Sequence, residues 1–192
     1  MIKKAGIIWD SDCYISKYIC DNDIIGEIVT PQMLATPFYK GSLIAIIVPT
    51  GFGNPAYSGL MPALKATSSR IRKFVEKGGR AMIFGAMSEN DGCYDWLPFK
   101  VEYSHEYFNS PVITDKDSDY CDIVRDFNEE SIECDGFFPE FEGECIVKTA
   151  EGRCIMIEKR FGRGCFIITS IHELPSRDFL DRICSGDSEI IF

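Results

Sequence analysis

The chain has 192 residues, of which 45% are hydrophobic, and its 30 acidic and 20 basic residues give a formal net charge of −10. This hydrophobic content excludes a disordered chain and allows one packed domain spanning residues 1–192. The acidic charge disfavours nucleic acid and anionic membranes as partners, because phosphate binding needs clustered lysine and arginine. No apolar run approaches the roughly 20 residues that a membrane-spanning helix requires.

The first residues are typical of a buried strand and not of a targeting segment. Residues 4–9 form a short apolar run that is followed by Asp10 and Asp12. This run is too short for the apolar core of a signal peptide. We therefore expect a cytoplasmic protein.

Nine cysteines are many for a chain of this length, and their number is odd. They form no C-x-x-C pair, and no histidine follows at zinc-finger spacing. We interpret them as reduced thiols that act as small hydrophobic residues. A metal cluster assembled across the fold and a redox-active or disulfide pair are the alternatives. The favoured interpretation requires no metal and no cofactor.

Apolar runs and helical patterns alternate along the first 85 residues, as a parallel sheet with covering helices requires. The continuous apolar run at 43–48 is typical of a central strand that is buried on both faces. Apolar residues at helical spacing before Gly78-Gly79 indicate a helix and its end. The sequence predicts strands at 4–9, 26–30, 43–48 and 80–85, helices at 12–20 and 60–77, and a short helical or irregular segment between Pro31 and Pro37.

The second half is less regular. Two alternating runs flank Glu151-Gly152 and predict a β-hairpin. His105 belongs to no motif, and we expect it on the surface. The sequence further predicts a strand at 96–103, an acidic loop-like segment at 114–136, hairpin strands at 145–149 and 154–158, a buried strand at 165–170 and a closing helix at 176–184.

Two loops are expected on one rim of the predicted sheet. In open α/β sheets, ligands bind beyond the carboxyl ends of the strands, which is where the loop 49–58 and the turn 85–93 lie. The small residues of Gly51-Phe52-Gly53 let the backbone approach a ligand. The turn Gly85-Ala86-Met87 follows a buried strand, where an α/β enzyme would present its nucleophile, but it offers no reactive side chain.

The succession of these motifs resembles the class I glutamine amidotransferase-like superfamily. A strand leading into 49–53, a helix ending in 74–79, a strand with a tight turn and a late strand ending in His172-Glu173 follow in the same order, across most of residues 4–184. The resemblance implies a flavodoxin-like three-layer α/β/α sandwich with a mostly parallel central sheet. The predicted hairpin then forms a C-terminal extension of that sheet.

Active members of the superfamily use a cysteine at the elbow after a strand, a histidine with a nearby glutamate, and backbone N–H donors from a glycine-rich loop. The resemblance gives the role of general base to His172, of orienting carboxylate to Glu173 and of oxyanion-hole loop to Gly51-Phe52-Gly53. Glu173 directly follows His172, whereas active members place one residue between them, and adjacent side chains on an extended segment point to opposite faces. The elbow position falls on Gly85, Ala86 or Met87, none of which is a nucleophile.

Three functions are compatible with these residues. The first is a protein without glutaminase activity that binds a small molecule or a protein partner at this degenerate rim, through 51–53, 85–87 and His172. The second is a hydrolase in which Ser88 or Cys93 acts as a displaced nucleophile with His172. The third is a domain that only mediates oligomerisation, and a homo-oligomer is compatible with each of them. The sequence favours the first.

Overall fold

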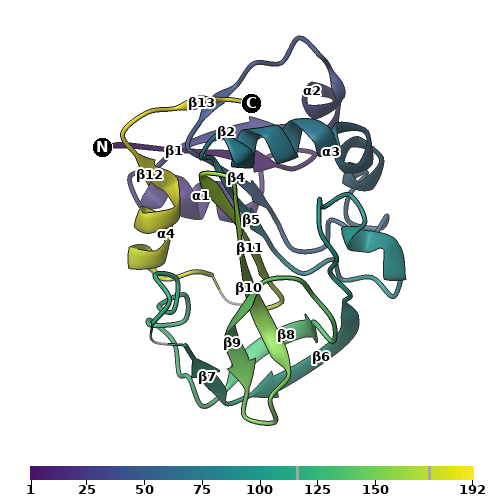
Figure 1. Ribbon diagram of the computed structural model, residues 1–192, viewed down its shortest axis with the longest axis vertical. Helices are drawn as coiled ribbons and strands as arrows, with labels where there is room; N and C mark the ends of the chain where they lie inside the picture. The colour runs from purple at the N-terminus through teal and green to yellow at the C-terminus, as the bar shows by residue number, and fades with distance from the viewer. Residues whose placement is uncertain (116, 173) are drawn as a thin grey trace.

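A nine-stranded sheet forms the centre of the computed structural model, which describes residues 1–115, 117–172 and 174–192 (Figure 1). The strands pair in the order β12-β1-β4-β5-β11-β10-β9-β7, and β2 also pairs with β1. Their bounds are β1 Ile2–Ile8, β2 Ile25–Val29, β4 Ala45–Val48, β5 Arg80–Ile83, β7 Val112–Thr114, β9 Glu144–Thr149, β10 Cys154–Phe161, β11 Gly164–Thr169 and β12 Ser185–Gly186.

The sheet has a parallel half and an antiparallel half. Strands β2, β1, β4, β5 and β11 run parallel to their neighbours in this group. Strands β11, β10, β9 and β7 are antiparallel, and β10 and β9 form the predicted hairpin around Glu151-Gly152. This arrangement confirms the predicted α/β fold with a flavodoxin-like parallel core and a hairpin extension.

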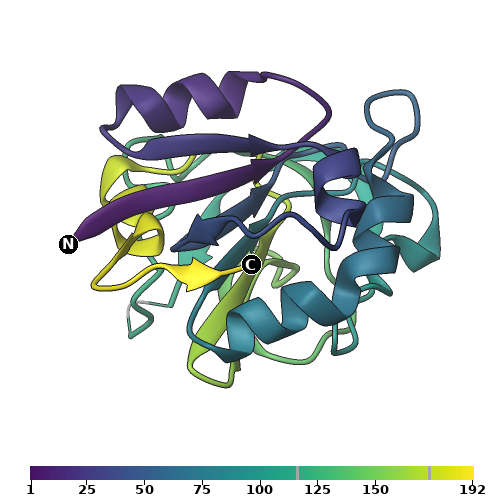
Figure 2. The same cartoon turned by 90° about the horizontal axis from the view of Figure 1, so that it is seen from above.

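The strand β4 shows why the sheet is covered on both faces. Its side chains alternate, so that Ile46 and Val48 belong to one hydrophobic cluster, whereas Ala45 and Ile47 belong to a second. The helices that contribute to the first cluster are α2 (Pro31–Ala35) and α3 (Leu60–Glu76); those of the second are α1 (Tyr14–Asp21) and α4 (Arg177–Cys184). Figure 2 shows α1 and α3 on opposite sides of the strands.

The helix α3 ends where the sequence predicted. Gly78 has a φ of +114°, and its N–H donates to the carbonyl of Val75 over 2.9 Å. The N–H of Gly79 reaches the carbonyl of Phe74 over 3.0 Å. Glycine tolerates this left-handed conformation, which turns the chain directly into β5.

Two predicted strands need correction. The run 43–48 is interrupted at Ile44, because β3 (Ser42–Leu43) pairs with β13 (Ile190–Ile191) in a separate two-stranded sheet. The described segment 96–103, predicted as a strand, forms only an isolated bridge between Val101 and Phe141. This segment, which contains Pro98, connects the 3-10 helix η1 (Asp91–Tyr94) to β6 (Ser104–Ser110).

The prediction of a loop at 114–136 is also wrong in part. Strand β8 (Ile132–Phe137) begins inside this segment and pairs with β6 in an antiparallel two-stranded sheet. Figure 1 shows this sheet close to β9 and β10, far from α2 and α3. Both strands carry polar residues at several positions, which hid them from a search for apolar runs.

Two further expectations concern the whole chain. None of the nine cysteines forms a disulfide bond in the described part of the chain, and five of them are buried. Of the helices in the described part of the chain, none is long and apolar enough to cross a membrane.

Candidate functional site

The loop after β4 and the turn after β5 are joined by backbone hydrogen bonds. The N–H of Gly51 donates to the carbonyl of Gly85 over 2.8 Å, and the N–H of Gly53 donates to the carbonyl of Ala86 over 3.1 Å. Gly51 has a φ of +90°, a conformation that favours glycine. Phe52 between them is fully buried. Two of the three N–H groups in the loop that the resemblance assigns to an oxyanion hole therefore donate to this turn.

The turn after β5 carries the strained backbone that an elbow requires. Met87 has a φ of +50°, one of two positive values among the described residues other than glycine. Ala86 before it is fully buried, and Met87 itself is half-buried. Of the three candidate elbow positions, Met87 therefore has the backbone conformation closest to that of an elbow residue, and its thioether is not a nucleophile.

Ser88 and Cys93 lie just beyond this turn. The side chain of Cys93 is 1% exposed, and burial raises the pKa of its thiol, although a hydrogen bond with Ser88 acts in the opposite direction. Ser88 is half-buried, and its hydroxyl also accepts from the N–H of Asn90 over 3.2 Å. A buried thiol that stays protonated is a poor nucleophile.

His172 follows β11 on the same rim. Its backbone N–H donates to the carbonyl of Glu133 over 2.8 Å, which ties it to β8. The imidazole is 41% exposed, and its Nδ1 atom lies 3.9 Å from Oδ2 of Asp135. The ring of Tyr107 meets it edge-on, with the centroids 6.4 Å apart. Glu173, the carboxylate that the resemblance assigns to this histidine, lies outside the described residues.

Asp135 on β8 is the residue of this site that the sequence did not reveal. It is fully buried, and its Oδ1 accepts from the hydroxyl of Tyr103 over 3.1 Å. Its backbone carbonyl accepts from the same hydroxyl over 2.5 Å and lies 2.8 Å from Nδ1 of His105. Gly85 makes room for it, because a Cβ there would lie 1.9 Å from Oδ1. His105, expected on the surface, is thus half-buried beside Asp135.

A signal for Asp135 existed in the sequence, although it was weak. Ile132, Cys134 and Phe138 surround it with apolar residues in a segment that is otherwise acidic. A carboxylate within such a run is unusual, because buried aspartate needs a partner. The partners come from β5, β6 and the end of β11, which are distant in sequence.

A cavity of about 240 Å³ opens beside His172, at the carboxyl ends of β1, β4 and β5. We call it the His172 cavity. Its lining is mainly apolar and includes Trp9, Ile15, Pro49, Phe84, His172 and Leu174. The first turn of α1 also reaches it through Tyr14. An apolar cavity with one imidazole can take a small ring or aliphatic group and hold it by one hydrogen bond.

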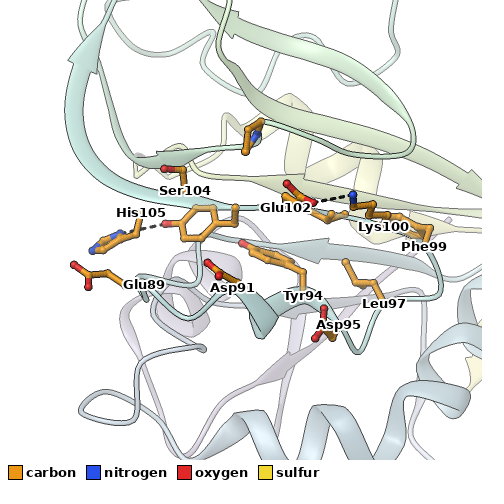
Figure 3. A pocket seen from close by; sticks show the side chains of 13 residues that line it. Glu89, Asp91, Tyr94, Asp95, Leu97, Phe99, Lys100, Glu102, Ser104 and His105 are labelled. Carbon is orange, nitrogen blue, oxygen red and sulfur yellow. Dashed lines mark hydrogen bonds and ion pairs between the residues drawn. The ribbon is translucent and has the colours of Figure 1, made fainter.

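A larger cavity of about 820 Å³, which we call the acidic groove, lies between η1 and the segment 97–105 (Figure 3). Figure 3 shows Glu89 near His105 at one end of it and Lys100 with Phe99 at the other. Glu102 and Glu140 each approach the Lys100 ammonium to 2.8 Å, and these contacts raise the pKa of Lys100 to about 12. The carboxylates that line the groove are Glu89, Asp91, Asp95 and Glu102.

Two tyrosines line the acidic groove and face the strand ends. Burial raises the pKa of Tyr94 and of Tyr103 well above the usual tyrosine range, so both hydroxyls stay protonated. Tyr94 donates to the carbonyl of Phe84 over 3.1 Å, whereas Tyr103 donates to Asp135. Asp135 contacts one residue of each cavity, namely Tyr103 of the groove and His172 of the small cavity. The described residues contain no group of three or more His, Cys, Asp or Glu side chains placed to hold a metal ion.

Comparisons with known proteins identify the fold but not the family. No family model matches the chain, and no curated protein matches it. Among solved structures, the chain is similar to a protein from Thermoplasma acidophilum that is described as a proposed GMP synthase component. The identity is 10% and the TM-score 0.62, with 96% of this chain and 94% of that one covered.

Two other solved structures extend this likeness. A cytoplasmic protein from Salmonella typhimurium is 10% identical with a TM-score of 0.57, covering 96% of this chain and 100% of that one. A β-galactosidase from Bacillus circulans sp. alkalophilus is 11% identical with a TM-score of 0.54, covering 93% of this chain and 29% of that one. At these identities the likeness establishes a shared α/β fold and nothing about the reaction.

Proposed function

We propose that this chain is a class I glutamine amidotransferase-like protein that binds a small molecule in the His172 cavity and does not hydrolyse glutamine. The observation that carries the proposal is the partly exposed imidazole of His172 in an apolar cavity at the strand ends. The neighbouring turn Gly85-Ala86-Met87 has no nucleophilic side chain. Ligands of open α/β sheets bind at this end of the strands.

The chemistry around the turn supports binding over amide hydrolysis. A cysteine nucleophile must be a reachable thiolate, whereas Cys93 is buried and its pKa is raised by that burial. An oxyanion hole needs N–H groups that point at the substrate. Those of Gly51 and Gly53 already donate to carbonyl groups of the protein.

The comparisons support the same proposal at a coarser level. The GMP synthase neighbour has the fold that the sequence motifs resemble, over nearly the whole chain. The β-galactosidase neighbour carries this fold on 29% of its chain, so the fold also occurs in a protein named for a different reaction. We place the protein in the cytoplasm, in line with the name of the Salmonella neighbour.

Indole is a suitable probe for the His172 cavity, because it is a small ring with one N–H donor. We expect the methyl NMR signals of Ile15 and Leu174, which line the cavity, to shift saturably when indole is added. Leu174→Trp fills the cavity and is expected to weaken binding at least tenfold. Phe38→Trp is the matched control, since Phe38 is 87% exposed and outside the cavity lining. Equal binding by both variants, or no binding to the wild type, contradicts the proposed site.

The second half of the proposal is tested with glutamine. We expect the wild type and His172→Ala to release ammonia from glutamine at the same background rate. Ammonia release that disappears in His172→Ala and also in Ser88→Ala or Cys93→Ala would establish the displaced-nucleophile hydrolase in place of the binding protein.

A further inference from the structure

One of the two buried carboxylates that have an unpartnered oxygen among the described residues lies beside His172. Asp135 has no exposed surface, and its Oδ2 atom has no hydrogen-bond partner among the described residues. Burying a carboxylate oxygen without a donor is costly, so such an oxygen calls for an explanation. The identity of the missing donor is therefore informative.

The hydrogen bonds between Asp135 and the neighbouring side chains involve its carbonyl group and Oδ1 and leave Oδ2 without a partner among the described residues. The single hydroxyl hydrogen of Tyr103 is shared between the backbone carbonyl and Oδ1 of Asp135, at 2.5 and 3.1 Å. Nδ1 of His105 lies 2.8 Å from the same carbonyl. Gly85 brings only backbone to this carboxylate. Within the described residues, the recorded ion-pair contact of Asp135 is with Nδ1 of His172, at 3.9 Å from Oδ2.

The backbone holds this pair in place. Asp135 donates its N–H to the carbonyl of Ser170 over 2.9 Å, and His172 donates its own to Glu133 over 2.8 Å. An isolated bridge joins Cys134 to Ile171 between these two bonds. The two side chains therefore start from directly paired segments, and Nδ1 must move by about 1 Å from its 3.9 Å separation to form a hydrogen bond with Oδ2.

We propose that Asp135 positions His172 with its proton on Nδ1, so that Nε2 accepts a hydrogen bond from a small apolar ligand that carries an N–H or O–H donor. An imidazole that donates from Nδ1 to a carboxylate keeps its lone pair on Nε2. This inference rests on the proposed function for its ligand, but the positioning role of Asp135 can be measured without one. It gives to Asp135 the orienting role that the sequence resemblance assigned to Glu173.

The His172 cavity fits such a ligand. Its walls are formed largely by Trp9, Ile15, Phe84 and Leu174, which favour an apolar body. The acceptor on His172 then adds directional selection, because a bound ligand takes the place of water at this nitrogen and an acceptor covered by a ligand without a donor is penalised. Indole meets both requirements, whereas benzofuran has the same shape and no donor.

The tautomer is measured directly by ¹⁵N NMR of the imidazole rings. The chain has two histidines, and a His105→Asn variant assigns their signals. We expect the wild-type His172 to carry hydrogen on Nδ1. Asp135→Asn replaces the acceptor by an amide that can donate, and we expect the hydrogen to move to Nε2. A wild-type His172 with hydrogen on Nε2, or a tautomer that Asp135→Asn leaves unchanged, overturns the inference.

Glu158→Gln is the matched control for loss of a buried carboxylate. Glu158 is 4% exposed and, like Asp135, has one oxygen without a hydrogen-bond partner among the described residues, but it has no recorded contact with His172. We expect the His172 tautomer to be unchanged in this variant. If Asp135→Asn fails to fold, the wild-type spectrum still decides the assignment of the hydrogen.

The ligand preference is tested by titrating indole and benzofuran. We expect the wild type to bind indole about tenfold more tightly than benzofuran, and Asp135→Asn to lose this preference. Equal affinity of the wild type for both compounds overturns the acceptor role of Nε2. If neither compound binds, the proposed function fails, whereas the NMR result still decides whether Asp135 positions His172.

Discussion

Two buried carboxylates stand in different regions of this molecule and have different neighbours. Asp135 lies at the carboxyl ends of the parallel strands, and its recorded ion-pair contact is with the imidazole of His172 at 3.9 Å. Glu158 lies on β10, where the guanidinium of Arg160 approaches it to 3.0 Å and the hydroxyl of Ser118 donates to it over 3.3 Å. Each has one oxygen without a hydrogen-bond partner among the described residues.

From these different neighbours we infer that Glu158 has a structural role, whereas Asp135 belongs to the proposed site. Arginine stays charged at every accessible pH, so the charge of Glu158 has a permanent partner. Asp135 instead faces an imidazole, which can carry its hydrogen on either ring nitrogen, so the carboxylate can select which nitrogen donates. Asp135 also touches residues of both cavities, whereas Glu158 supports the attachment of the segment around Ser118 to the sheet.

The largest expected effect comes from Gly85→Ala. A Cβ at this position would lie 1.9 Å from Oδ1 and 2.4 Å from Oδ2 of Asp135, so the carboxylate must leave its place. We expect the free energy of unfolding to fall by about 3 kcal/mol or more, as for severe overpacking. Urea denaturation followed by circular dichroism measures this loss.

Gly152→Ala is the matched control for Gly85→Ala. Gly152 has a φ of +89°, and a Cβ there meets nothing within 4 Å. Backbone strain alone is expected to cost about 1 kcal/mol. Equal losses for the two variants would show that Asp135 does not occupy the space beside Gly85.

Tyr103→Phe is expected to have the next largest effect. It removes the donor to both the backbone carbonyl and the side chain of Asp135, which leaves a buried carboxylate with still fewer partners. We expect a loss of about 1–3 kcal/mol in the free energy of unfolding. Tyr120→Phe is the counterpart near Glu158, where the hydroxyl forms a hydrogen bond with the thiol of Cys165 at 3.3 Å, and it should cost less. A larger loss of unfolding free energy for Tyr120→Phe than for Tyr103→Phe in urea denaturation would contradict this ranking.

The parallel half of the fold follows from local patterns. The run Ala45–Val48 is apolar at every position, which indicates a strand covered on both faces, and α3 combines helical spacing with a glycine end. The rim formed by Gly51 and Gly85 follows from the same order of elements. Each strand and helix in this half depends on residues that are close together in the sequence, and the rim follows because neighbouring parallel strands end at the same edge.

The strands β6 and β8, and with them Asp135, could not be predicted in this way. Acidic residues in a polar segment are normally solvated, yet Asp135 is fully buried and Asp122 is 4% exposed. Arg182 binds Asp122 through two contacts of 2.9 and 3.0 Å, and Tyr103 binds Asp135. Such partners come from distant parts of the chain, and composition does not reveal them.

The smallest expected effect is the pH dependence that Glu158 contributes. Burial raises the pKa of this carboxyl, and the nearby Arg160 lowers it less. As the pH rises from about 4, glutamate in the unfolded chain releases its proton before the folded one does. The folded state then binds more protons than the unfolded state, so its contribution to stability falls until the folded carboxyl has also ionised.

Glu158→Gln is therefore expected to flatten the fall in unfolding free energy that begins as the pH rises above about 4. Arg160→Met sharpens the test, because it removes the guanidinium and makes Glu158 resemble Asp135 in having no permanent cation. We expect a steeper fall of stability with rising pH in Arg160→Met than in the wild type, and no such slope when Glu158→Gln is added. If the fall of stability with rising pH persists in the double variant, it arises from another titrating group, and Glu158 is not its source.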